Sequence, residues 1–442
     1  MNELAVVVLA AGKGVRMKSQ RPKVMHGIGG QPMLAHLLNT ARGLGAKRMV
    51  VVRAGDAGEV AALAEQHGAV SAVQAQALGT GHAVMAAEDA LKNFSGNVLV
   101  LFGDAPLVTK ATLQKLTASL AKADVAALGF RPADPTGYGR MVTKGGRLER
   151  IVEHKDASTE EKSIGLCFAG PMAGKAAVLF DLLKAIDNKN AQGEYYLTDV
   201  IAAANTRGLS IAFAEADEGE TLGVNSKADL AKAEAAFQDR RRRALMDAGV
   251  TFTDPNTVYL SADTKIEADA VIGPFVVFGP GVTVRERAEV RAFCHIEGAD
   301  IGAGAIVGPF ARLRPGAVLE EDAHIGNFVE VKNSRIEQGA KANHLAYLGD
   351  TRVGARANVG AGTITCNYDG FGKHQTDIGK GVFIGSNSTL VAPLKIADGA
   401  YVAAGSVITK NVDTDAMAFG RARQVDKPGH GKSFRLRKEA EK

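Results

Sequence analysis

The chain lacks tryptophan, has few aromatic residues and contains only three cysteines. Aromatic residues make up 5% of its 442 residues. The cysteines, Cys167, Cys294 and Cys366, are odd in number and widely spaced, and no CxxC pair occurs. This pattern argues against a disulfide framework and against a cysteine-based metal site.

Long hydrophobic runs are also missing. The apolar segment Leu4–Ala11 is too short to cross a membrane, and Glu3 stands where a signal peptide would carry a basic flank. No later run of about 18 apolar residues occurs. We therefore expect a cytoplasmic protein with no membrane span.

Outside its C-terminal tail the chain has no excess of either charge. The formal net charge is +5, and the segment from Arg421 to the end, with eight basic and three acidic residues, carries all of it. The remainder is neutral, so bulk charge argues against a nucleic-acid-binding protein. The hydrophobic content of 46% and the length indicate a globular protein of about two or three domains.

The first half of the chain alternates short apolar runs with helical patterns. Strands are predicted at Leu4–Leu9, Arg48–Val52 and Asn97–Phe102, and an amphipathic helix at Met33–Leu44. Strands that alternate with helices favour a mostly parallel α/β sheet with right-handed crossovers. Ligands of such sheets bind beyond the carboxyl ends of the strands, here after the first and third of these runs.

A helical pattern runs from Ser226 to Gly249, and the glycine is suited to end it. The pattern contains four consecutive arginines, Arg240–Arg243. We interpret this charged run as a solvated face of a helix that links two domains, rather than as a binding or targeting segment.

From Thr251 onward the pattern changes to a repeat of six residues. An aliphatic residue recurs every six positions, with occasional five-residue steps, and a small residue often follows it. This is the hexapeptide repeat of a parallel β-helix, in which the aliphatic side chain points inward and the small residue relieves crowding at the corner. The inward positions predicted in this way are Ile266, Ile272, Phe278, Val284, Val290, Ile296, Ile301, Val307, Leu313, Leu319, Ile325, Val331, Ile336, Leu348, Val353, Val359, Ile378, Ile384, Leu390, Ile396, Val402 and Ile408.

Two segments are predicted to break the six-residue frame. One is Lys341–Leu348, which contains His344, and the other is the insertion Cys366–Asp377, which carries Asn367 and Tyr368. Loops that leave a rigid solenoid often bind ligands. We therefore expect functional residues in both segments and expect the insertion to project outward.

A glycine-rich loop follows the first predicted strand. Gly12 and Gly14 let backbone N–H groups approach an anion, and Lys13, Arg16 and Lys23 supply positive charge. The alternative interpretation of this segment alone is a glycine-rich surface turn with incidental lysines.

Asp104 stands just after the apolar strand that ends at Phe102. A lone carboxylate buried there would be costly, and Mg²⁺ takes one or two carboxylates together with phosphate oxygens. We interpret Asp104 as a Mg²⁺ ligand. The alternative is a helix cap before Pro106.

Seven motifs occur in order along the first half of the chain and, with the hexapeptide domain behind them, resemble a single family. The motifs are LAAGKGxRM at Leu9–Met17 with Pro22 and Lys23, LGTGHA at Leu78–Ala83, GDAPL at Gly103–Leu107, TGYGR at Thr136–Arg140, IVEHKD at Ile151–Asp156, GEYYLTD at Gly193–Asp199 and GVN at Gly223–Asn225. The chain resembles the bifunctional bacterial N-acetylglucosamine-1-phosphate uridyltransferases/glucosamine-1-phosphate acetyltransferases over essentially its whole length, apart from the basic tail.

The resemblance implies a fold and two activities. It implies a Rossmann-like α/β nucleotidyltransferase domain at 1–227, a helical linker at 228–249, and a left-handed parallel β-helix acetyltransferase domain with the basic tail at 250–442. The second domain would acetylate glucosamine-1-phosphate with acetyl-CoA. The first would then transfer UMP from UTP to N-acetylglucosamine-1-phosphate and release pyrophosphate. The resemblance also implies a homotrimer, in which Asn367 and Tyr368 of one subunit reach the His344 site of a neighbour.

By position, the resemblance assigns the residues of the uridyltransferase site. They are Leu9, Gly12, Lys23, Gln74, Gly79 and Thr80 for the uridine and phosphate, Gly139, Glu153, Ser163 and Asn225 for the sugar, and Asp104 and Asn225 for Mg²⁺. Ser163 stands where the family usually has asparagine, and Phe102 replaces a usual tyrosine. Arg16 and Lys23 would neutralise charge that accumulates toward the leaving pyrophosphate, so no protein nucleophile is required.

The same match assigns the acetyltransferase site. His344 would be the general base, because a neutral imidazole with an ordinary pKa of about 6.5 can take the proton of the substrate ammonium. The remaining assignments are Arg314, Lys332, Tyr347 and Asn358 for the sugar phosphate, and Ala361, Asn367, Tyr368, Ser386, Ala404 and Arg421 for acetyl-CoA.

Two other functions are open at this stage. One is another nucleotidyltransferase, such as a nucleoside-diphosphate-glucose pyrophosphorylase, with a merely regulatory β-helix, which would not need His344 or the insertion. The other is a non-enzymatic trimeric scaffold that senses nucleotide sugars. The carboxylate of Asp104 makes this scaffold the weaker alternative.

Overall fold

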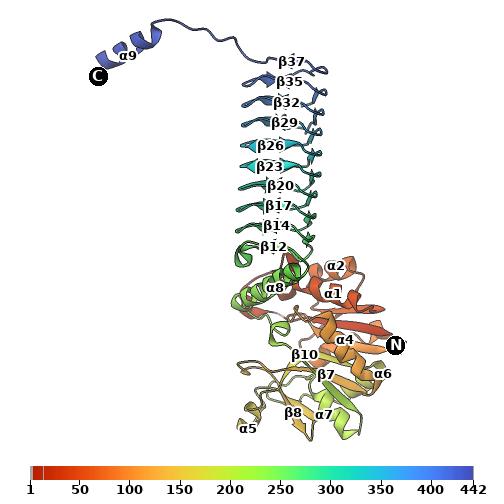
Figure 1. Ribbon diagram of the computed structural model, residues 1–442. Coiled ribbons are helices and arrows are strands. Elements are labelled where there is room, and N and C mark those ends of the chain that lie inside the picture. Colours follow the sequence, from red (N-terminus) through yellow and green to blue (C-terminus); the bar gives the residue numbers. More distant parts are fainter. Residues whose placement is uncertain (1–2, 13, 442) are drawn as a thin grey trace. The chain divides into compact units, whose positions relative to one another are not determined.

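The computed structural model describes residues 3–12 and 14–441. The chain divides into two compact units, Met1–Arg240 and Arg241–Lys442. The first is an α/β unit and the second is a stack of coils (Figure 1). None of the helices in the described ranges is both long and apolar enough to span a bilayer.

A mixed sheet with helices packed against it forms the first unit. Its strands are β1 (Leu4–Ala10), β2 (Gly27–Ile28), β3 (Gln31–Pro32), β4 (Arg48–Arg53), β5 (Val70–Val73), β6 (Asn97–Phe102), β7 (Val125–Phe130), β8 (Arg140–Lys144), β9 (Arg147–Val152), β10 (Cys167–Lys175) and β11 (Ile211–Ala216). Its helices are η1 (Val15–Met17), η2 (Lys23–Met25), α1 (Met33–Gly43), α2 (Gly58–Gln66), α3 (Thr80–Met85), η3 (Asp89–Leu91), α4 (Lys110–Ala118), η4 (Ser119–Ala121), α5 (Thr159–Lys162), α6 (Ala176–Leu183), α7 (Asp199–Thr206) and η5 (Glu218–Glu220).

The strand order of this sheet is β11-β7-β10-β6-β1-β4-β5, and β8 pairs with β9 and β10 beside it. β1 is parallel to both β4 and β6, whereas β10 is antiparallel to β6 and β7. Successive residues of β1 enter two separate hydrophobic cores, Val7 on one face and Val6 and Val8 on the other. Burial on both faces explains why this strand is continuously apolar. The predicted strands and the mostly parallel α/β sheet are confirmed.

The predicted helix after Ser226 is also present, as α8 (Lys227–Asp247). Its arginines, however, are not all solvated. Arg240 donates to the carbonyl of Leu107 at 2.7 Å, Arg241 donates to that of Thr264 at 2.7 Å, and Arg242 donates to that of Pro255 at 2.9 Å.

The burial of Arg241 and Arg242 explains the correction. Arg242 is only 7% exposed, and burial lowers the pKa of Arg241 below its ordinary value. A guanidinium has several donors, so it can satisfy loop carbonyls that a shorter side chain would not reach. The interpretation as a solvated face is wrong for Arg241 and Arg242, while Arg240 and Arg243 are exposed.

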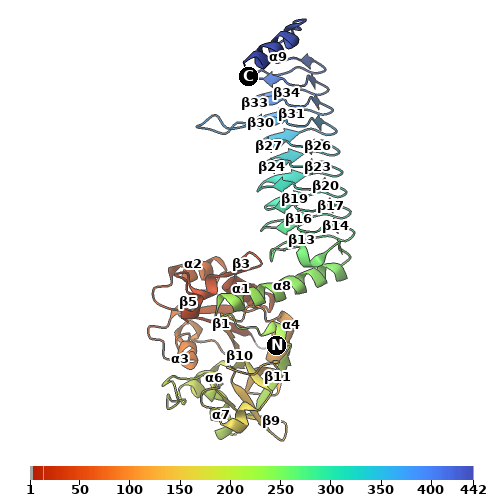
Figure 2. The same ribbon diagram turned by 90° about the vertical axis from the view of Figure 1, so that its left-hand side faces the viewer.

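Coils of three short strands form the second unit (Figure 2). One sheet contains β12 (Thr251–Phe252), β14 (Val271–Ile272), β17 (Glu289–Val290), β20 (Ile306–Val307), β23 (His324–Asn327), β26 (Lys341–His344), β29 (Asn358–Val359), β32 (Phe383–Ile384), β35 (Tyr401–Val402) and β37 (Met417–Ala418). A second contains β13 (Lys265–Ile266), β16 (Thr283–Val284), β19 (Ala299–Ile301), β22 (Ala317–Leu319), β25 (Arg335–Ile336), β28 (Thr351–Val353), β31 (Thr376–Ile378) and β34 (Leu394–Ile396). A third contains β15 (Val277–Phe278), β18 (His295–Ile296), β21 (Arg312–Leu313), β24 (Glu330–Lys332), β27 (Tyr347–Gly349), β30 (Ile364–Cys366), β33 (Thr389–Val391) and β36 (Val407–Ile408).

The strands of each sheet pair in parallel with the strand of the next coil, and the predicted inward residues form one continuous buried core. The turn η6 (Pro255–Thr257) lies in the first coil. The C-terminal helix α9 (His430–Ala440) belongs to the basic tail, and every described residue from Arg421 onward is exposed.

The predicted break of the frame at Lys341–Leu348 is wrong. Ala342 is 1% exposed and takes the inward position, six residues after Ile336 and six before Leu348. β26 keeps its register with both β23 and β29. The repeat was recognised by its larger aliphatic residues, and alanine is smaller than these. Ala342 nevertheless occupies the inward position of its coil.

Glycines that follow inward residues lie against the backbone of the next coil. A Cβ on Gly302 would lie 2.6 Å from the carbonyl carbon of Glu320, and one on Gly326 would lie 2.0 Å from the carbonyl oxygen of Asn343. Real Cβ atoms do not approach backbone this closely, so the small residue is required by coil stacking.

We therefore expect Gly302→Ala to lower the free energy of unfolding by about 1–3 kcal/mol, because the backbone of the next coil must shift. Chemical denaturation of the full chain measures the change. The matched control is Gly372→Ala, whose Cβ would meet no atom closer than 3.6 Å. Equal stability of the two variants would contradict this account of the repeat.

Candidate active sites

The carboxyl ends of β1 and β6 lie side by side. The two strands pair in parallel, with Leu9 opposite Phe102, and the amide of Gly103 donates to the carbonyl of Leu9 at 2.9 Å. A Cβ on Gly103 would lie 2.6 Å from that carbonyl oxygen. Only glycine permits this approach, which brings the predicted loop and Asp104 to one edge of the sheet.

Lys23, Asp104 and Asn225 meet at this edge. Lys23 Nζ lies 2.6 Å from Asp104 Oδ2 and 3.1 Å from Asn225 Oδ1. The amide of Val224 donates to the carbonyl of Asp104 at 2.8 Å, which holds Asn225 beside the carboxylate although it is far away in the sequence. The side chains of Lys23 and Asp104 are 12% and 25% exposed.

The donors at this point fit Mg²⁺. One carboxylate oxygen and one amide oxygen face a single cation, here the lysine ammonium. Mg²⁺ is usually held by one or two protein oxygens and completes its shell with waters and substrate phosphates. The described residues contain no group of three or more His, Cys, Asp or Glu side chains suited to an all-protein metal cage, and this sparse donor set suits a metal that binds together with a phosphate.

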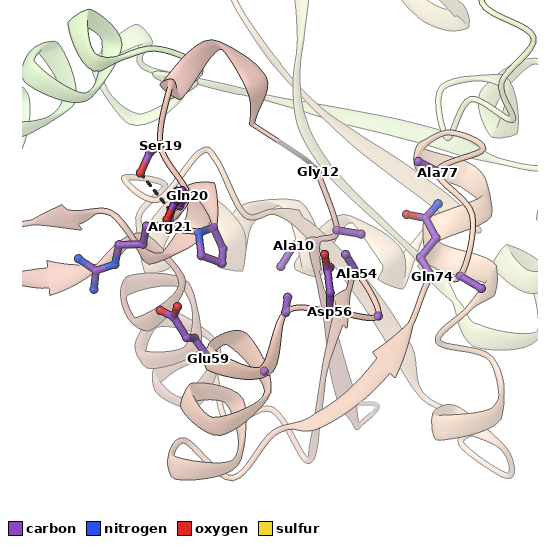
Figure 3. A pocket seen from close by; sticks show the side chains of 16 residues that line it. Ala10, Gly12, Ser19, Gln20, Arg21, Ala54, Asp56, Glu59, Gln74 and Ala77 are labelled. Carbon is purple, nitrogen blue, oxygen red and sulfur yellow. Dashed lines mark hydrogen bonds between the residues drawn. The ribbon is translucent and has the colours of Figure 1, made fainter.

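A cavity of about 550 Å³ opens beside this edge (Figure 3). Gly12 and Ala10 from the end of β1 form one part of its wall, and Gln74 forms another. The Gln74 amide nitrogen lies 3.0 Å from the carbonyl oxygen of Gly79 and 3.1 Å from His82 Nδ1. The side chain is 8% exposed and is therefore held in one orientation.

Gly79 and Thr80 lie behind Gln74, at the start of α3. Gly79 has a φ of 104°, and a Cβ there would lie 2.6 Å from the carbonyl oxygen of Tyr195. The Thr80 hydroxyl oxygen accepts from the amide of Leu197 at 3.0 Å. The predicted residues Gln74, Gly79 and Thr80 are thus brought together, with the threonine hydroxyl engaged by the backbone.

Gly139 and Glu153 also lie together. A Cβ on Gly139 would lie 3.6 Å from Glu153 Oε2, and Thr198 donates to Glu153 Oε1 at 3.1 Å. Burial raises the pKa of the Glu153 carboxyl above its ordinary value. Ser163 behaves differently: it is exposed at the C-terminus of α5, and its hydroxyl donates to the carbonyl of Glu160 at 2.6 Å.

The basic residues of the glycine-rich loop are not all placed at the site. Arg16 is exposed on η1, and Lys13 lies outside the described residues. Lys23 is the predicted cation of this segment that the structure places against Asp104.

In the second unit, His344 lies beside Asn327 of the preceding coil. The two residues are paired in the register of β23 and β26. His344 Nδ1 lies 2.6 Å from Asn327 Oδ1, and the amide of Leu345 donates to the carbonyl of Asn327 at 3.0 Å. His344 and Asn327 line a hollow of about 560 Å³ together with His324 and Phe328. The interaction leaves Nε2 of His344 available to a ligand.

A column of residues continues upward from His344 along one corner of the coils. His344 stands two residues after the inward residue Ala342. In the same way, Ala361, Ser386 and Ala404 each stand two residues after the inward residue of β29, β32 and β35. Backbone bonds connect the levels, from Asn387 N to the carbonyl of Ala361 at 2.7 Å and from Gly405 N to that of Ser386 at 2.8 Å. We call Asn327, His344, Ala361, Ser386 and Ala404 the corner column. Arg421 lies near its end, because a Cβ on Gly405 would lie 3.8 Å from Arg421 Cδ.

Three cations gather on another sheet of the coils. Arg314 pairs with Glu330 at 2.9 Å, and Lys332 pairs with Asp350 at 3.5 Å. Lys373 stands next to Lys332, whose ammonium lowers the pKa of Lys373. Neighbouring cations repel, so this cluster favours an anionic ligand that would relieve the repulsion.

Tyr347 lies on the third sheet of the coils, the sheet that contains Lys332, and Asn358 does not. Tyr347 follows the same strand series as Arg314 and Lys332, and a Cβ on Gly349 would lie 2.5 Å from its hydroxyl oxygen. Asn358 is on β29, paired with Lys341, in the sheet of the corner column. The predicted sugar-phosphate residues are therefore divided between two sheets of one chain.

The predicted insertion leaves the coils as a loop between β30 and β31 (Figure 2). Its tip is exposed, with Tyr368 at 60% and Phe371 at 98%. Asn367, in contrast, is 7% exposed and donates to Asp350. The prediction that Asn367 projects outward is wrong, because its amide satisfies a carboxylate that also accepts from Asn333 at 2.6 Å.

Asn327, His82 and Lys373 are site residues that the sequence analysis missed. An asparagine inside a six-residue repeat carries no signal of its own, whereas His82 lies in the motif at Leu78–Ala83, which gave no role to its histidine. The register of the repeat places Asn327 one coil below His344, and counting coils from His344 would have found it. Lys373 lies in the insertion, where nothing in the spacing shows its approach to Lys332.

The stability of the first unit should depend on the charge of Asp199. Burial, and next the neighbouring Glu153 carboxylate, raise the pKa of Asp199 to about 6. In the unfolded chain the group loses its proton near its ordinary value of 3.8. Between these values the folded state holds the extra proton, so its contribution to stability is present below pH 3.8 and is lost as the pH rises to about 6.

Asp199→Asn should therefore melt a few degrees higher than the wild type at pH 7.5 and at nearly the same temperature at about pH 3.5, below the ordinary pKa. Differential scanning calorimetry of the full chain at the two pH values measures this. Asp181→Asn, at an exposed position of α6 paired with Arg207, is the control. A wild-type advantage at pH 7.5 would contradict the raised pKa.

Comparisons with known proteins agree with this architecture. Residues 6–252 match the MobA-like NTP transferase domain, and residues 376–410 match the bacterial transferase hexapeptide, six repeats. The fold is a Rossmann-like nucleotidyltransferase unit followed by a left-handed parallel β-helix of hexapeptide repeats.

The curated relatives extend the match to the whole chain. The chain is 53% identical over 444 residues to bifunctional protein GlmU of Paramagnetospirillum magneticum, covering 100% of this chain and 98% of that protein. It is 55% identical over 442 residues to bifunctional protein GlmU of Hyphomonas neptunium, covering 99% and 96%, and 52% identical over 439 residues to that of a Jannaschia species, covering 99% and 97%. With more than half of all positions identical across both units, the chain belongs to the family of the bifunctional protein GlmU.

Proposed function

We propose that this chain is a bifunctional transferase of UDP-N-acetylglucosamine biosynthesis. Its β-helix acetylates glucosamine-1-phosphate with acetyl-CoA, and its α/β unit transfers UMP from UTP to N-acetylglucosamine-1-phosphate, releasing pyrophosphate. One observation carries the proposal beyond family membership: Lys23, Asp104 and Asn225 meet at the carboxyl edge of a nucleotidyltransferase sheet. The same chain has His344 at the foot of the corner column.

Uridylyl transfer requires positioning and charge neutralisation. A phosphate oxygen of N-acetylglucosamine-1-phosphate attacks the α-phosphorus of UTP in line with the leaving pyrophosphate. Asp104 and Asn225 would hold Mg²⁺, which when bound neutralises and orients phosphate oxygens. Lys23 then leaves its contacts with both residues and donates to phosphate, and Arg16 adds charge on the side of the pyrophosphate.

The remaining predicted residues of the first unit hold the two substrates. Gln74 reads the uracil edge at the cavity wall, and Glu153 orients the sugar through its hydroxyl groups. The roles of the other positions are backbone contacts or packing around the ligand. They are Leu9, Gly12, Gly79 and Thr80 on the uridine side and Gly139 and Ser163 on the sugar side, while Asn225 would contact the substrate beside the metal that it helps to hold.

Acetyl transfer requires the substrate amine in its neutral form. His344 Nε2 takes a proton from the ammonium, while Asn327 accepts from Nδ1–H and holds the ring. The amine then attacks the thioester carbon, a C–N bond forms, the C–S bond breaks, and the thiol of coenzyme A leaves with a proton. No cysteine nucleophile is needed.

The coenzyme would lie along the corner column above His344. Ala361, Ser386 and Ala404 offer backbone groups at successive levels, and Arg421 supplies charge for its phosphates. Asn367 lies at the base of the insertion, and Tyr368 lies on its exposed part. Arg314, Lys332, Tyr347 and Asn358 would bind the sugar phosphate, and Lys373 adds a third cation to that set.

We place the uridyltransferase domain at 1–227, the linker at 228–249 and the acetyltransferase domain at 250–442. UTP and acetyl-CoA are made inside the cell, which supports a cytoplasmic location. The proposed partners are these small molecules and further copies of the chain, with no nucleic acid.

An exposed aromatic ladder supports assembly as a homotrimer. Phe275, Phe293, Phe310 and Phe328 stack outside the coils with ring centroids 5.0, 4.8 and 5.1 Å apart, and each is 45–55% exposed. Each phenylalanine directly follows a corner position of its coil, as Phe328 follows Asn327. Leu345 has the same place in the next coil, directly after His344. Contiguous exposed apolar surface of this kind marks an interaction site.

The aromatic ladder ends where the coenzyme is proposed to begin. Above Leu345 the equivalent positions are Gly362, Asn387 and Gly405, which are small or polar. The lower part of this corner therefore suits a neighbouring subunit and the upper part leaves room for a ligand. A neighbour docked on the ladder would also bring a second sheet to His344, which would reunite the divided sugar-phosphate residues.

Phe310→Asp should release smaller species in analytical ultracentrifugation and reduce acetyl transfer at least tenfold, because a charge in the middle of the ladder opposes burial. Uridylyl transfer should change little. Phe310→Leu, which keeps the site apolar as Leu345 does, is the control and should stay assembled. A Phe310→Asp variant of unchanged size would contradict the ladder as the interface.

The two activities should separate by mutation. Asp104→Asn should reduce UMP transfer about 100-fold or more and spare acetylation, because the metal ligand serves only the first unit. His344→Ala should do the opposite, with a loss of about 10²–10⁴ in acetyl transfer. Pyrophosphate release and free thiol formation report the two reactions, and each variant is the folding control for the other. Loss of both activities in either folded variant would sink the two-site proposal.

A further inference from the structure

His82 stands behind Gln74, and its ring fixes what the Gln74 amide offers to the cavity. His82 belongs to α3, and its Nδ1 lies 3.1 Å from the Gln74 amide nitrogen. The same nitrogen lies 3.0 Å from the carbonyl oxygen of Gly79. These two contacts determine the orientation of the amide without further assumption.

A carbonyl oxygen can only accept a hydrogen bond, so the Gln74 atom beside the Gly79 carbonyl must be the donating NH₂ group. The second hydrogen of that group points to His82 Nδ1. Nδ1 must therefore carry a lone pair, and the ring proton must be on Nε2. A rotated amide would instead place Oε1 against the Gly79 carbonyl oxygen, and His82 could meet it only by moving its ring proton from Nε2 to Nδ1.

The only polar atom of Gln74 left for a ligand is then Oε1, an acceptor. Figure 3 shows this oxygen on the side of the amide nearer Gly12, in the wall of the cavity formed by Gly12 and Ala77. Uracil offers a donor at N3–H between two carbonyl groups. Cytosine offers an unprotonated N3, an acceptor, at the same position. An acceptor that cannot rotate favours the first base and repels the second.

We infer that His82 is a positioning residue that makes the nucleotide site select uracil over cytosine, by locking the Gln74 amide with its oxygen toward the base. This inference rests on the proposed uridylyl transfer and adds a residue that touches neither substrate nor metal. Gly79 cooperates with it, because its φ of 104° directs its carbonyl at Gln74 and a side chain there would collide with Tyr195.

The lock needs both acceptors. With the Gly79 carbonyl alone, rotation of the amide no longer requires a change of the His82 tautomer, and a rotated Gln74 offers a donor to cytosine N3. Removing a partner of one neutral hydrogen bond corresponds to about a tenfold change in an equilibrium. The preference for one base over the other should fall by this factor, while the rest of the site stays intact.

The experiment compares kcat/KM for UTP and CTP in the full chain with His82→Leu and His82→Asn. His82→Leu removes the acceptor and should lower the UTP:CTP ratio about tenfold, with the KM for N-acetylglucosamine-1-phosphate unchanged. His82→Asn can place an amide oxygen where Nδ1 stood and should keep the ratio within about twofold of the wild type. A merely structural role would lower both rates together and leave the ratio unchanged, which would overturn the inference.

Two further results keep the outcome decisive. Acetyl transfer by the β-helix tests whether each variant is folded and assembled. If His82→Leu does not fold, ¹⁵N NMR of the wild-type histidine decides: a proton on Nε2 supports the lock, and a proton on Nδ1 overturns it. A wild-type chain that transfers no UMP from UTP would defeat the proposed function itself, whereas a chain active with UTP but with an unchanged ratio in His82→Leu would defeat only this inference.

Discussion

Parallel strand pairing in strict register is the interaction on which both sites depend. In the first unit it sets Leu9 opposite Phe102, so that the glycine-rich loop and Asp104 leave the sheet at one edge. In the second unit it sets Asn327 opposite His344 and repeats that corner at Ala361, Ser386 and Ala404. Parallel strands cannot slip by one residue without turning their buried side chains outward. The hydrophobic interior thus holds polar groups in fixed positions at the edges and corners.

Charges in both sites are held in pairs that a ligand can take over. The Lys23 ammonium neutralises Asp104 in the first unit. Asp350 is the comparable carboxylate of the second unit. Burial alone would raise the pKa of Asp350, but hydrogen bonds from Asn333 and Asn367 and the charge of Lys332 lower this pKa below its ordinary value. Such pairing limits the cost of placing charge in half-buried positions. These pairs also hold the cations in fixed orientations before a ligand binds. A bound phosphate would replace the carboxylate as the partner of each cation.

Three errors of the sequence analysis have a common origin. Arg241 and Arg242 were interpreted as solvated, Lys341–Leu348 as a frame break, and Asn367 as projecting outward. In each case a residue type was judged by its usual behaviour: arginine as exposed, alanine as too small for an inward position, asparagine in a loop as free. The structure reverses each judgement through a specific neighbour, namely loop carbonyls for the arginines, the two flanking coils for Ala342 and the carboxylate of Asp350 for Asn367. Partners that lie far away in sequence cannot be read from local pattern.

The sequence by itself determined those parts of the protein that follow from the period of its hydrophobic residues and from the order of its motifs. A period of six produces coils, apolar runs alternating with helical patterns produce a parallel sheet, and the order of the glycine-rich loop, Asp104 and Asn225 matches one family. Tertiary structure alone decided which of these residues touch, that the Lys23 ammonium lies between Asp104 and Asn225, that His82 orients Gln74, and that Lys373 lies beside Lys332. The reason is physical: periodicity is a property of the backbone, which each residue repeats, whereas a site depends on the contacts of a few side chains across gaps that loop geometry and packing close.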